Sequence, residues 1–267
     1  MGGLTGILLG QMQISLNERP ISFSYDKVRA LLIYLWVESD CNYHRDTLAA
    51  LLWPEADDTH ARTNLRKALA VLRLSIGDHE ATMPQITVTR DTLQFNGYCL
   101  NRLDVAQFRL LANAGGLDSH TPGVPDSATA SQLEAAMRLY QGDFLGHVGP
   151  RESAPFTEWA AAIREQLHQC AVATLGRLAR YYERRSDWDS AQRVLRQILT
   201  LEPWDEEAYR ALMSVLARRG QRGAALQQYE RCRRMLDSEL GMRPEAATDT
   251  LRDQIRAGAL LEQTASR

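Results

Sequence analysis

The last third of the chain repeats with a period of 34 residues. Four positions that hold apolar or small residues recur at this spacing, namely Leu178 and Leu212, Tyr182 and Leu216, Ala191 and Ala225, and Leu195 and Tyr229. The polar break at residues 185–187 recurs at 219–221. Each period therefore predicts two apolar helices joined by a short turn. Such a unit cannot bury its apolar face alone, so neighbouring units are expected to stack.

A helix-turn-helix unit of this length, with a small residue early in its second helix, is typical of tetratricopeptide repeats. Ala191 and Ala225 occupy that position and allow close helix approach, and Pro203 falls where this repeat places its turn proline. These features favour the repeat over a generic helical bundle for residues 172–237. Upstream, we expect helices at 104–112, 132–140 and 156–185 and a loop over 115–129.

Residues 59–76 predict an amphipathic helix whose outer face carries one sign of charge. Its core-facing positions follow helical spacing, namely Ala61, Leu65, Ala68, Leu69 and Leu72. The opposite side carries arginine, lysine and threonine, and the segment contains no Asp or Glu. Most solvated helices mix both signs, so this face favours a polyanionic partner, with DNA as the first candidate. The alternative is a solvated helix that happens to lack acids.

The elements around this helix predict a small mixed domain. Strands are expected at 4–10, 12–16 and 21–23, a turn at 17–20, and helices at 27–38 and 44–52. Asp26 is expected to cap the first helix, Trp53-Pro54 to stop the second, Asp57 or Asp58 to cap the third, and Gly77-Asp78 to end it. A hairpin of strands at 85–89 and 93–95, joined at 90–92, follows.

Three helices followed by a two-stranded ribbon are the layout of a winged helix-turn-helix. In that arrangement the third helix enters the major groove of DNA, and the hairpin, or wing, contacts the flanking backbone or minor groove. The predicted fold class is therefore mostly α with a small β part. A winged helix-turn-helix over residues 1–100 is followed by an all-α tetratricopeptide-like domain over 101–267.

Charge and cysteine usage limit the partners. The formal net charge is −2, and residues 1–112 carry 11 Lys+Arg against 12 Asp+Glu, so DNA affinity must come from a local patch. Cys41, Cys99, Cys170 and Cys232 are far apart in sequence and form no zinc-binding spacing with the histidines. With no signal peptide and no long apolar run, we expect a cytoplasmic protein with free thiols, no metal or other cofactor, and no membrane contact.

Ten residues are candidates for DNA contact: Thr59, Arg62, Thr63, Arg66, Lys67, Arg73, Thr89, Arg90, His44 and Arg45. Arginine donates bidentately to guanine edges or phosphates, lysine acts as a point charge, and threonine suits phosphate or thymine-methyl contacts. Arg73 is expected to bind phosphate, and Thr89 and Arg90 form the wing tip. His44 and Arg45 begin a helix, where N–H groups favour phosphate. The alternative for Arg45 is an exposed charge paired with Asp40 or Asp46.

Residues 26–78, which include LLWPEADDTHARTNLRKALAVLRLSIGD, resemble the winged-helix domain of the Streptomyces antibiotic regulatory protein family, an OmpR-like winged helix. The segments LDVAQF at 103–108, GDFL at 142–145, FTEWAAAIREQL at 156–167 and ELGMRPE at 239–245 resemble the bacterial transcriptional activation domain that follows it in this family. The order and spacing of these segments carry the resemblance over nearly the whole chain.

This resemblance implies a sequence-specific bacterial transcription activator. Its recognition helix would be residues 59–75 and its wing about 87–95, and it would bind direct repeats near a promoter as a dimer or as tandem copies. Its tetratricopeptide-like half would contact RNA polymerase. The loop at 113–130 departs from the family in length and composition. The chain has no receiver domain, so the sequence does not support phosphorylation as the switch.

The sequence also bears on three other functions. Helical repeats commonly present a concave surface to a partner peptide, which would make the chain a protein-interaction adaptor. The acid-free face at 59–76 argues against the adaptor hypothesis, because an adaptor does not need a face of one charge. An enzyme is disfavoured because no phosphate-binding loop, nucleophile elbow or metalloprotease motif occurs. Some members of the family carry an ATPase or sensor domain after the activation domain, so the chain could be the N-terminal part of a larger regulator.

Overall fold

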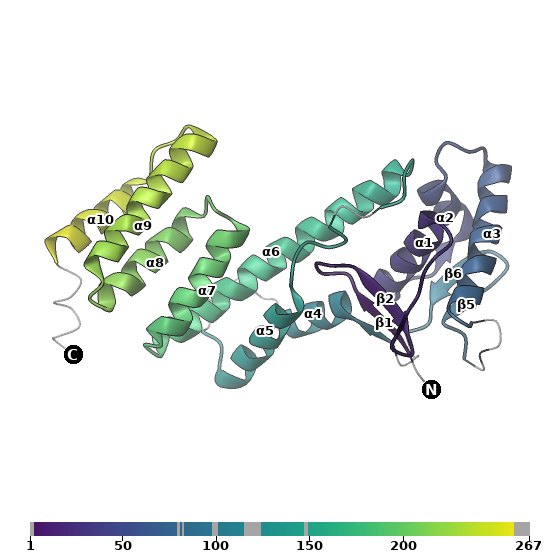
Figure 1. Cartoon of the computed structure of the whole chain (residues 1–267), viewed down its shortest axis with the longest axis horizontal. Helices are drawn as coiled ribbons and strands as arrows, with labels where there is room; N and C mark the ends of the chain where they lie inside the picture. The colour runs from purple at the N-terminus through teal and green to yellow at the C-terminus, as the bar shows by residue number, and fades with distance from the viewer. Residues whose placement is uncertain are drawn as a thin grey trace. The chain divides into compact units, whose positions relative to one another are not determined.

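The fold is mostly helical with a small β part, as predicted (Figure 1). The computed structural model describes residues 3–78, 81, 83–97, 101–114, 124–146 and 149–258. The chain divides into two compact units. The first unit comprises Met1–Leu110 and Arg138–Leu167, and the second comprises Leu111–Met137 and His168–Arg267. No helix in the described part of the chain is both long and apolar enough to cross a membrane.

A four-stranded sheet opens the first unit. Its order is β3-β2-β1-β7, in which β1 and β7 are parallel and the other pairs are antiparallel. The strands are β1 (Leu4–Ile7), β2 (Gln13–Leu16), β3 (Arg19–Pro20) and β7 (Arg102–Leu103). The hairpin between β2 and β3 turns at Asn17 and Glu18, whose φ angles are 52° and 65°.

The strand predicted at residues 21–23 is wrong. The tight turn occupies only two residues, so pairing resumes at Arg19 and the short strand ends at Pro20. Proline is tolerated here because β3 lies at the edge of the sheet. At an edge, a residue without an N–H group need not cost a hydrogen bond between strands. The strand predicted at 4–10 is also too long, since β1 ends at Ile7 and Gly10 adopts a φ of 105°.

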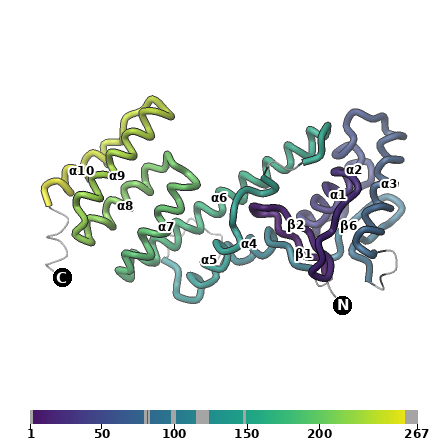
Figure 2. Tube along the Cα trace, viewed as in Figure 1, coloured from purple at the N-terminus to yellow at the C-terminus, as the bar shows by residue number. Residues whose placement is uncertain are grey.

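Three helices form the centre of the first unit and pack against one another (Figure 1 and Figure 2). They are α1 (Asp26–Val37), α2 (Arg45–Leu52) and α3 (Asp58–Ser75). The capping role predicted for Asp26 is wrong, because Tyr25 is the N-cap and the Asp26 carboxylate instead accepts a hydrogen bond from Arg29 at 2.6 Å. Asp57 caps α3 as predicted, accepting from the N–H groups of Thr59 and His60 at 3.1 Å.

The core stripe predicted for α3 is confirmed. All five of its members are buried, with relative exposures of 6% or less. Helix α1 is buried along most of its length, and its Trp36 stacks on Phe95 with ring centroids 5.3 Å apart. Helix α3 begins one residue earlier than predicted, so Asp58 adds an acid to its first turn. The acid-free character therefore holds from Thr59 onward.

The predicted wing is present as a hairpin. Strands β5 (Ile86–Val88) and β6 (Thr92–Phe95) are antiparallel and belong to a three-stranded sheet of order β4-β6-β5. The third strand, β4 (Tyr43–His44), corrects the prediction that the second helix begins at His44. His44 pairs with Thr92 in the sheet, which holds it in an extended conformation, and α2 therefore begins at Arg45.

Residues 138–167 join the first unit through specific contacts. Helix α6 (Ala154–Arg184) begins here. The hydroxyl of Ser153 donates to the Leu51 carbonyl at 2.7 Å, and the Trp159 indole donates to Glu38 at 2.9 Å. Phe144, in the segment GDFL, bridges to Leu9. The segments GDFL and FTEWAAAIREQL therefore pack with the winged helix.

Helix α4 (Asp104–Ala112) is anchored by a buried carboxylate. Asp104 accepts hydrogen bonds from the N–H groups of Leu8 and Leu9 at 2.7 and 2.8 Å. Burial raises the pKa of this carboxyl group, while its N–H donors oppose that shift. The contact fixes the start of α4 to the end of β1.

The second unit contains the predicted repeat. Its remaining helices are α5 (Ser127–Leu139), α7 (Trp188–Leu201), α8 (Glu206–Arg218), α9 (Arg222–Met235) and α10 (Ala246–Ala257), with a π-helical turn over Leu236–Leu240. Helix α5 begins earlier than predicted, because Asp126 accepts from the Thr129 N–H at 2.8 Å and caps it. Part of the loop predicted at 115–129 is therefore helix, and residues 115–123 lie outside the described residues.

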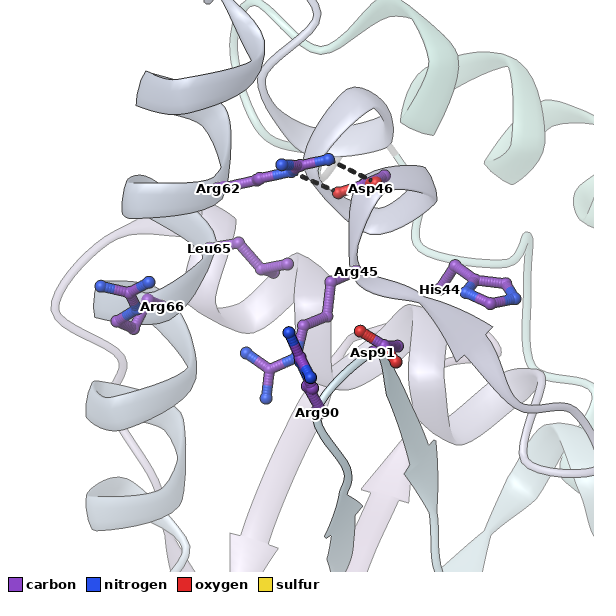
Figure 3. A pocket seen from close by; sticks show the side chains of 8 residues that line it. All are labelled: His44, Arg45, Asp46, Arg62, Leu65, Arg66, Arg90 and Asp91. Carbon is purple, nitrogen blue, oxygen red and sulfur yellow. Dashed lines mark hydrogen bonds and ion pairs between the residues drawn. The ribbon is translucent and has the colours of Figure 1, made fainter.

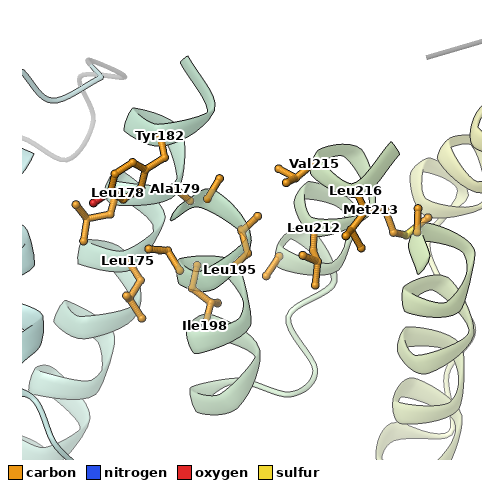
Figure 4. Packing of buried hydrophobic residues seen from close by; sticks show 14 of the residues in the cluster. Leu175, Leu178, Ala179, Tyr182, Leu195, Ile198, Leu212, Met213, Val215 and Leu216 are labelled. Carbon is orange, nitrogen blue, oxygen red and sulfur yellow. The ribbon is translucent and has the colours of Figure 1, made fainter. Parts of the chain in front are cut away.

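The eight residues paired at an offset of 34 are all buried. The labelled members of this set point into one apolar cluster between neighbouring helices (Figure 4). The two turns match as well. The Asp187 N–H donates to the Tyr182 carbonyl, and the Gln221 N–H donates to the Leu216 carbonyl, both at 2.9 Å. The preceding residues, Ser186 and Gly220, both have positive φ.

Candidate nucleic-acid interface

Three elements of the first unit surround a groove of about 410 Å³. These elements are the start of α2, the outer side of α3 and the tip of the wing (Figure 3). The groove is lined by His44, Arg45, Asp46, Arg62, Leu65, Arg66, Arg90 and Asp91, and we call these eight residues the basic groove. Five of the ten candidate DNA-contact residues are among them. They are far apart in sequence, and the fold brings them together.

Arg45 connects α2 to the wing. Its guanidinium donates to the carbonyl of Thr89 at 2.9 Å, and its backbone N–H donates to the carbonyl of Asp91 at 2.9 Å. The side chain is half-buried. These two contacts hold the wing tip against the start of α2, so Arg45 organises the groove as well as lining it.

Arg62 forms a two-point ion pair with Asp46. Its Nε atom lies 2.6 Å from Oδ1 and its Nη2 atom 2.7 Å from Oδ2 (Figure 3). The hydrogen bond from Arg62 lowers the pKa of the Asp46 carboxyl group, so this group is ionised at neutral pH. The sequence suggests Asp46 only as an alternative partner for Arg45, because its actual partner Arg62 is 16 residues away along the chain.

Arg66, Lys67 and Arg90 are exposed and make no hydrogen bond or ion pair with any residue in the described ranges. Arg66 lies on α3 and Arg90 at the wing tip, and both line the basic groove (Figure 3). Lys67 lies next to Arg66 on the exposed side of α3 but does not line the groove. Unpaired cations in such a position are available to phosphates or base edges.

Two of the three candidate threonines, Thr63 and Thr89, use their hydroxyl groups in contacts within the protein. The Thr63 hydroxyl donates to the Thr59 carbonyl one turn earlier in α3, at 2.9 Å. In the wing, the Thr89 hydroxyl accepts from the Thr92 N–H at 2.9 Å and thereby closes the turn. Thr59 is exposed in the first turn of α3. Thr89 therefore shapes the wing tip that presents Arg90.

Arg73 lies outside the basic groove, near the end of α3. Its Nε atom is 3.3 Å from Oδ2 of Asp78, whose side chain is fully buried. Asp78 also accepts from the N–H groups of Gln85 and Ile86 at the base of the wing. These contacts tie the end of α3 to β5. The sequence indicated Asp78 only as a helix end, because its partners in the wing are distant along the chain.

The charge of the basic groove is local. Four arginines face two aspartates, which leaves a formal charge of +2 with His44 neutral, whereas residues 1–112 together carry a small negative charge. The cations come from α2, α3 and the wing. A concave surface with this charge attracts polyanions without making the whole unit a polycation.

Comparison with known proteins supports both halves of the fold. A family model described as the bacterial transcriptional activator domain matches residues 103–256. The transcriptional regulatory protein MoaR1 of Mycobacterium tuberculosis is 23% identical over 247 residues, which cover 89% of this chain and 74% of MoaR1. A structure of Mycobacterium tuberculosis EmbR in complex with a low affinity phosphopeptide matches with a TM-score of 0.72 at 19% identity, covering 100% of this chain and 70% of EmbR.

Proposed function

The chain belongs to the bacterial transcriptional activator domain family, in agreement with its resemblance to the Streptomyces antibiotic regulatory proteins, and from this premise we propose that it is a sequence-specific DNA-binding activator. The observation that carries the proposal is the basic groove, in which arginines from α2, α3 and the wing converge beside an exposed basic helix face. This is the arrangement that a winged helix needs in order to bind duplex DNA.

In the proposed complex, α3 enters the major groove. Arg62 and Arg66 face the base edges, while Lys67 and Thr59 contact the phosphate backbone. Arg90 at the wing tip binds the flanking backbone or minor groove. His44 and Arg45 lie at the start of α2, where helix N–H groups favour phosphate.

The remaining candidates have narrower roles in the proposed complex. Thr63 approaches the DNA only through its methyl group or by exchanging its present hydrogen bond. Thr89 supports the wing turn. Arg73 contacts phosphate only if DNA extends past the end of α3, since its present partner is Asp78.

The second unit suggests the other half of the function. Stacked helical pairs form surfaces that bind proteins, and we propose RNA polymerase as the partner, in line with the family resemblance. The DNA-binding part would then be residues 1–100 and the activating part 101–267. Binding to direct repeats as a dimer or as tandem copies, and a cytoplasmic location, belong to the same proposal.

A genome-wide footprint of the protein on its own DNA, followed by titration of the best site, tests the proposal. Arg66→Ala is expected to weaken binding to that site by about 1–3 kcal/mol, and more than it weakens binding to random DNA, if Arg66 contacts a base. Equal losses on both DNAs would restrict Arg66 to phosphate contact. A log–log salt slope near zero would contradict the groove as a phosphate-binding surface.

The adaptor hypothesis predicts a different result. A helical-repeat adaptor with a degenerate winged helix would give no footprint, and Arg66→Ala would leave partner capture unchanged. The near-absence of acids on the exposed side of α3 and the convergence of four arginines in the basic groove favour DNA over this alternative.

A further inference from the structure

We propose that Asp46 is a positioning residue that orients Arg62 to read a guanine in the major groove. The inference rests on the proposed DNA-binding function and deepens it, because it assigns one base contact and a second residue that controls it. It is carried by the geometry of the ion pair between α2 and α3.

The pairing occupies one edge of the Arg62 guanidinium. Asp46 accepts from Nε and Nη2, which form the side of the group. One N–H of Nη2 and both N–H groups of Nη1 remain, and two of these point in parallel along the end of the side chain. A guanine presents two acceptors, O6 and N7, to the major groove, and it is the base edge that such a fork fits.

The carboxylate also selects between possible targets. An isolated arginine is attracted to any phosphate, whereas the ion pair of Arg62 with an ionised Asp46 carries no net formal charge. A phosphate approaching this pair meets the Asp46 carboxylate, but a guanine edge is neutral and accepts the free N–H groups. Arg66 and Arg90 have no such acid partner among the described residues, so a phosphate is not repelled from either of them and each can bind a phosphate or a base edge.

Stability does not explain the pair. The side chains of Arg62 and Asp46 are 58% and 64% exposed, and exposed ion pairs contribute little to folding. Rigid neighbours, however, hold both partners. Asp46 lies in the first turn of α2, directly after a strand that pairs with the wing, and Arg62 follows the buried Ala61 in α3. Such support gives a contact residue the precision that base reading requires.

The test begins with the best footprinted site and a set of duplexes in which each base pair is changed in turn. Wild-type protein is expected to require guanine at one position, and Asp46→Asn should reduce the preference there by about fivefold or more. Arg62→Lys, which keeps the charge but loses the fork, should reduce the same preference. Affinity for random DNA should stay equal or rise in Asp46→Asn, because one negative charge leaves the groove.

Glu55→Gln is the matched control. It removes the same charge from an exposed position in the loop between α2 and α3, outside the basic groove, and should leave the base preference unchanged. Asp46→Glu retains the carboxylate and should restore part of the preference. Thermal unfolding of each variant checks that the fold is intact.

Each other outcome overturns the inference. An unchanged base preference in Asp46→Asn would show that Arg62 needs no positioning. A uniform loss over all duplexes would indicate a general effect on the groove. A change at a position that Arg62→Lys does not affect would mean that Asp46 reads a base itself. If wild-type protein binds no DNA, the proposed function fails as well, whereas binding with an unaltered preference in Asp46→Asn overturns only the role of Asp46.

Discussion

The buried carboxylate of Asp78 joins the end of α3 to the base of the wing, and its loss should destabilise the first unit. Its side chain is fully buried, and it accepts hydrogen bonds from the N–H groups of Gln85 and Ile86 and from Arg73. In Asp78→Ala both backbone N–H groups lose their acceptor. A buried donor left unpaired costs about 1–3 kcal/mol. Ile86 is buried, whereas Gln85 is half-buried and regains some solvation.

We therefore expect Asp78→Ala to lower the free energy of unfolding of the first unit by about 2–4 kcal/mol. For a unit of this size the corresponding fall in the unfolding midpoint is about 6–12 °C. Thermal or urea unfolding measures the total. Hydrogen exchange monitored at the Gln85 and Ile86 amides locates the effect, because these two groups should exchange faster than in the wild type.

Arg73→Ala is the matched control for this variant. It removes the charged partner of Asp78 but leaves both backbone hydrogen bonds in place, and the Arg73 side chain is about one-third exposed. Its cost should stay below about 1 kcal/mol. Equal losses for Asp78→Ala and Arg73→Ala would refute the reasoning, since the ion pair alone would then account for the effect. Unchanged exchange at Gln85 and Ile86 would refute it too.

Two further predictions concern stability. The hydroxyl of Tyr140 is buried without a hydrogen-bond partner among the described residues, and burial raises its pKa to about 12. Tyr140→Phe should therefore stabilise the protein by about 1 kcal/mol. In urea unfolding measured over a range of pH, the variant should also lose less stability than the wild type as the pH rises from about 10 to about 12. A destabilised Phe variant would indicate that the hydroxyl is solvated. Ala225 is fully buried where two repeat helices approach, so Ala225→Leu should lower the free energy of unfolding by about 1–3 kcal/mol. The control Ala247→Leu, at an exposed position of α10, should leave it nearly unchanged. Equal effects of the two substitutions would contradict close packing at Ala225.

The direction of the pH effect follows from the raised pKa. A tyrosine whose folded-state pKa exceeds its unfolded value contributes stability that is complete below the unfolded pKa. This contribution is lost as the pH rises through the folded value, because the unfolded chain then releases the proton more easily. Tyr182, whose pKa burial also raises to about 12, adds a loss of the same sign in the second unit.

Periodic features were predictable from the sequence. The stripe from Ala61 to Leu72 is buried as its spacing predicted, and so are the residues that recur at 34-residue intervals. Both patterns reflect a repeated local geometry that exposes one side to solvent and the other to the core. The cap at Asp57 was predictable for the same reason, because its hydrogen bonds reach only two and three residues along the chain.

Contacts between elements were not predictable in this way. Arg62 and its partner Asp46 are 16 residues apart, and Arg45 and the Thr89 carbonyl are 44 residues apart. Nothing in the local pattern of either member signals the other. His44 shows the same limit, since its own segment reads as a helix start, and only pairing with Thr92 in the wing makes it part of a strand.

The charge of the proposed DNA-binding surface is therefore a property of the tertiary structure. From Thr59 onward α3 carries no acid, which suggested a surface of one sign, but α2 and the wing bring Asp46 and Asp91 into the groove beside its arginines. Because the two aspartates neutralise part of the positive charge of the arginines, the groove should bind random DNA weakly. Discrimination between sequences must then come from oriented donors such as the Arg62 fork, because base edges differ in hydrogen-bond pattern while phosphates do not.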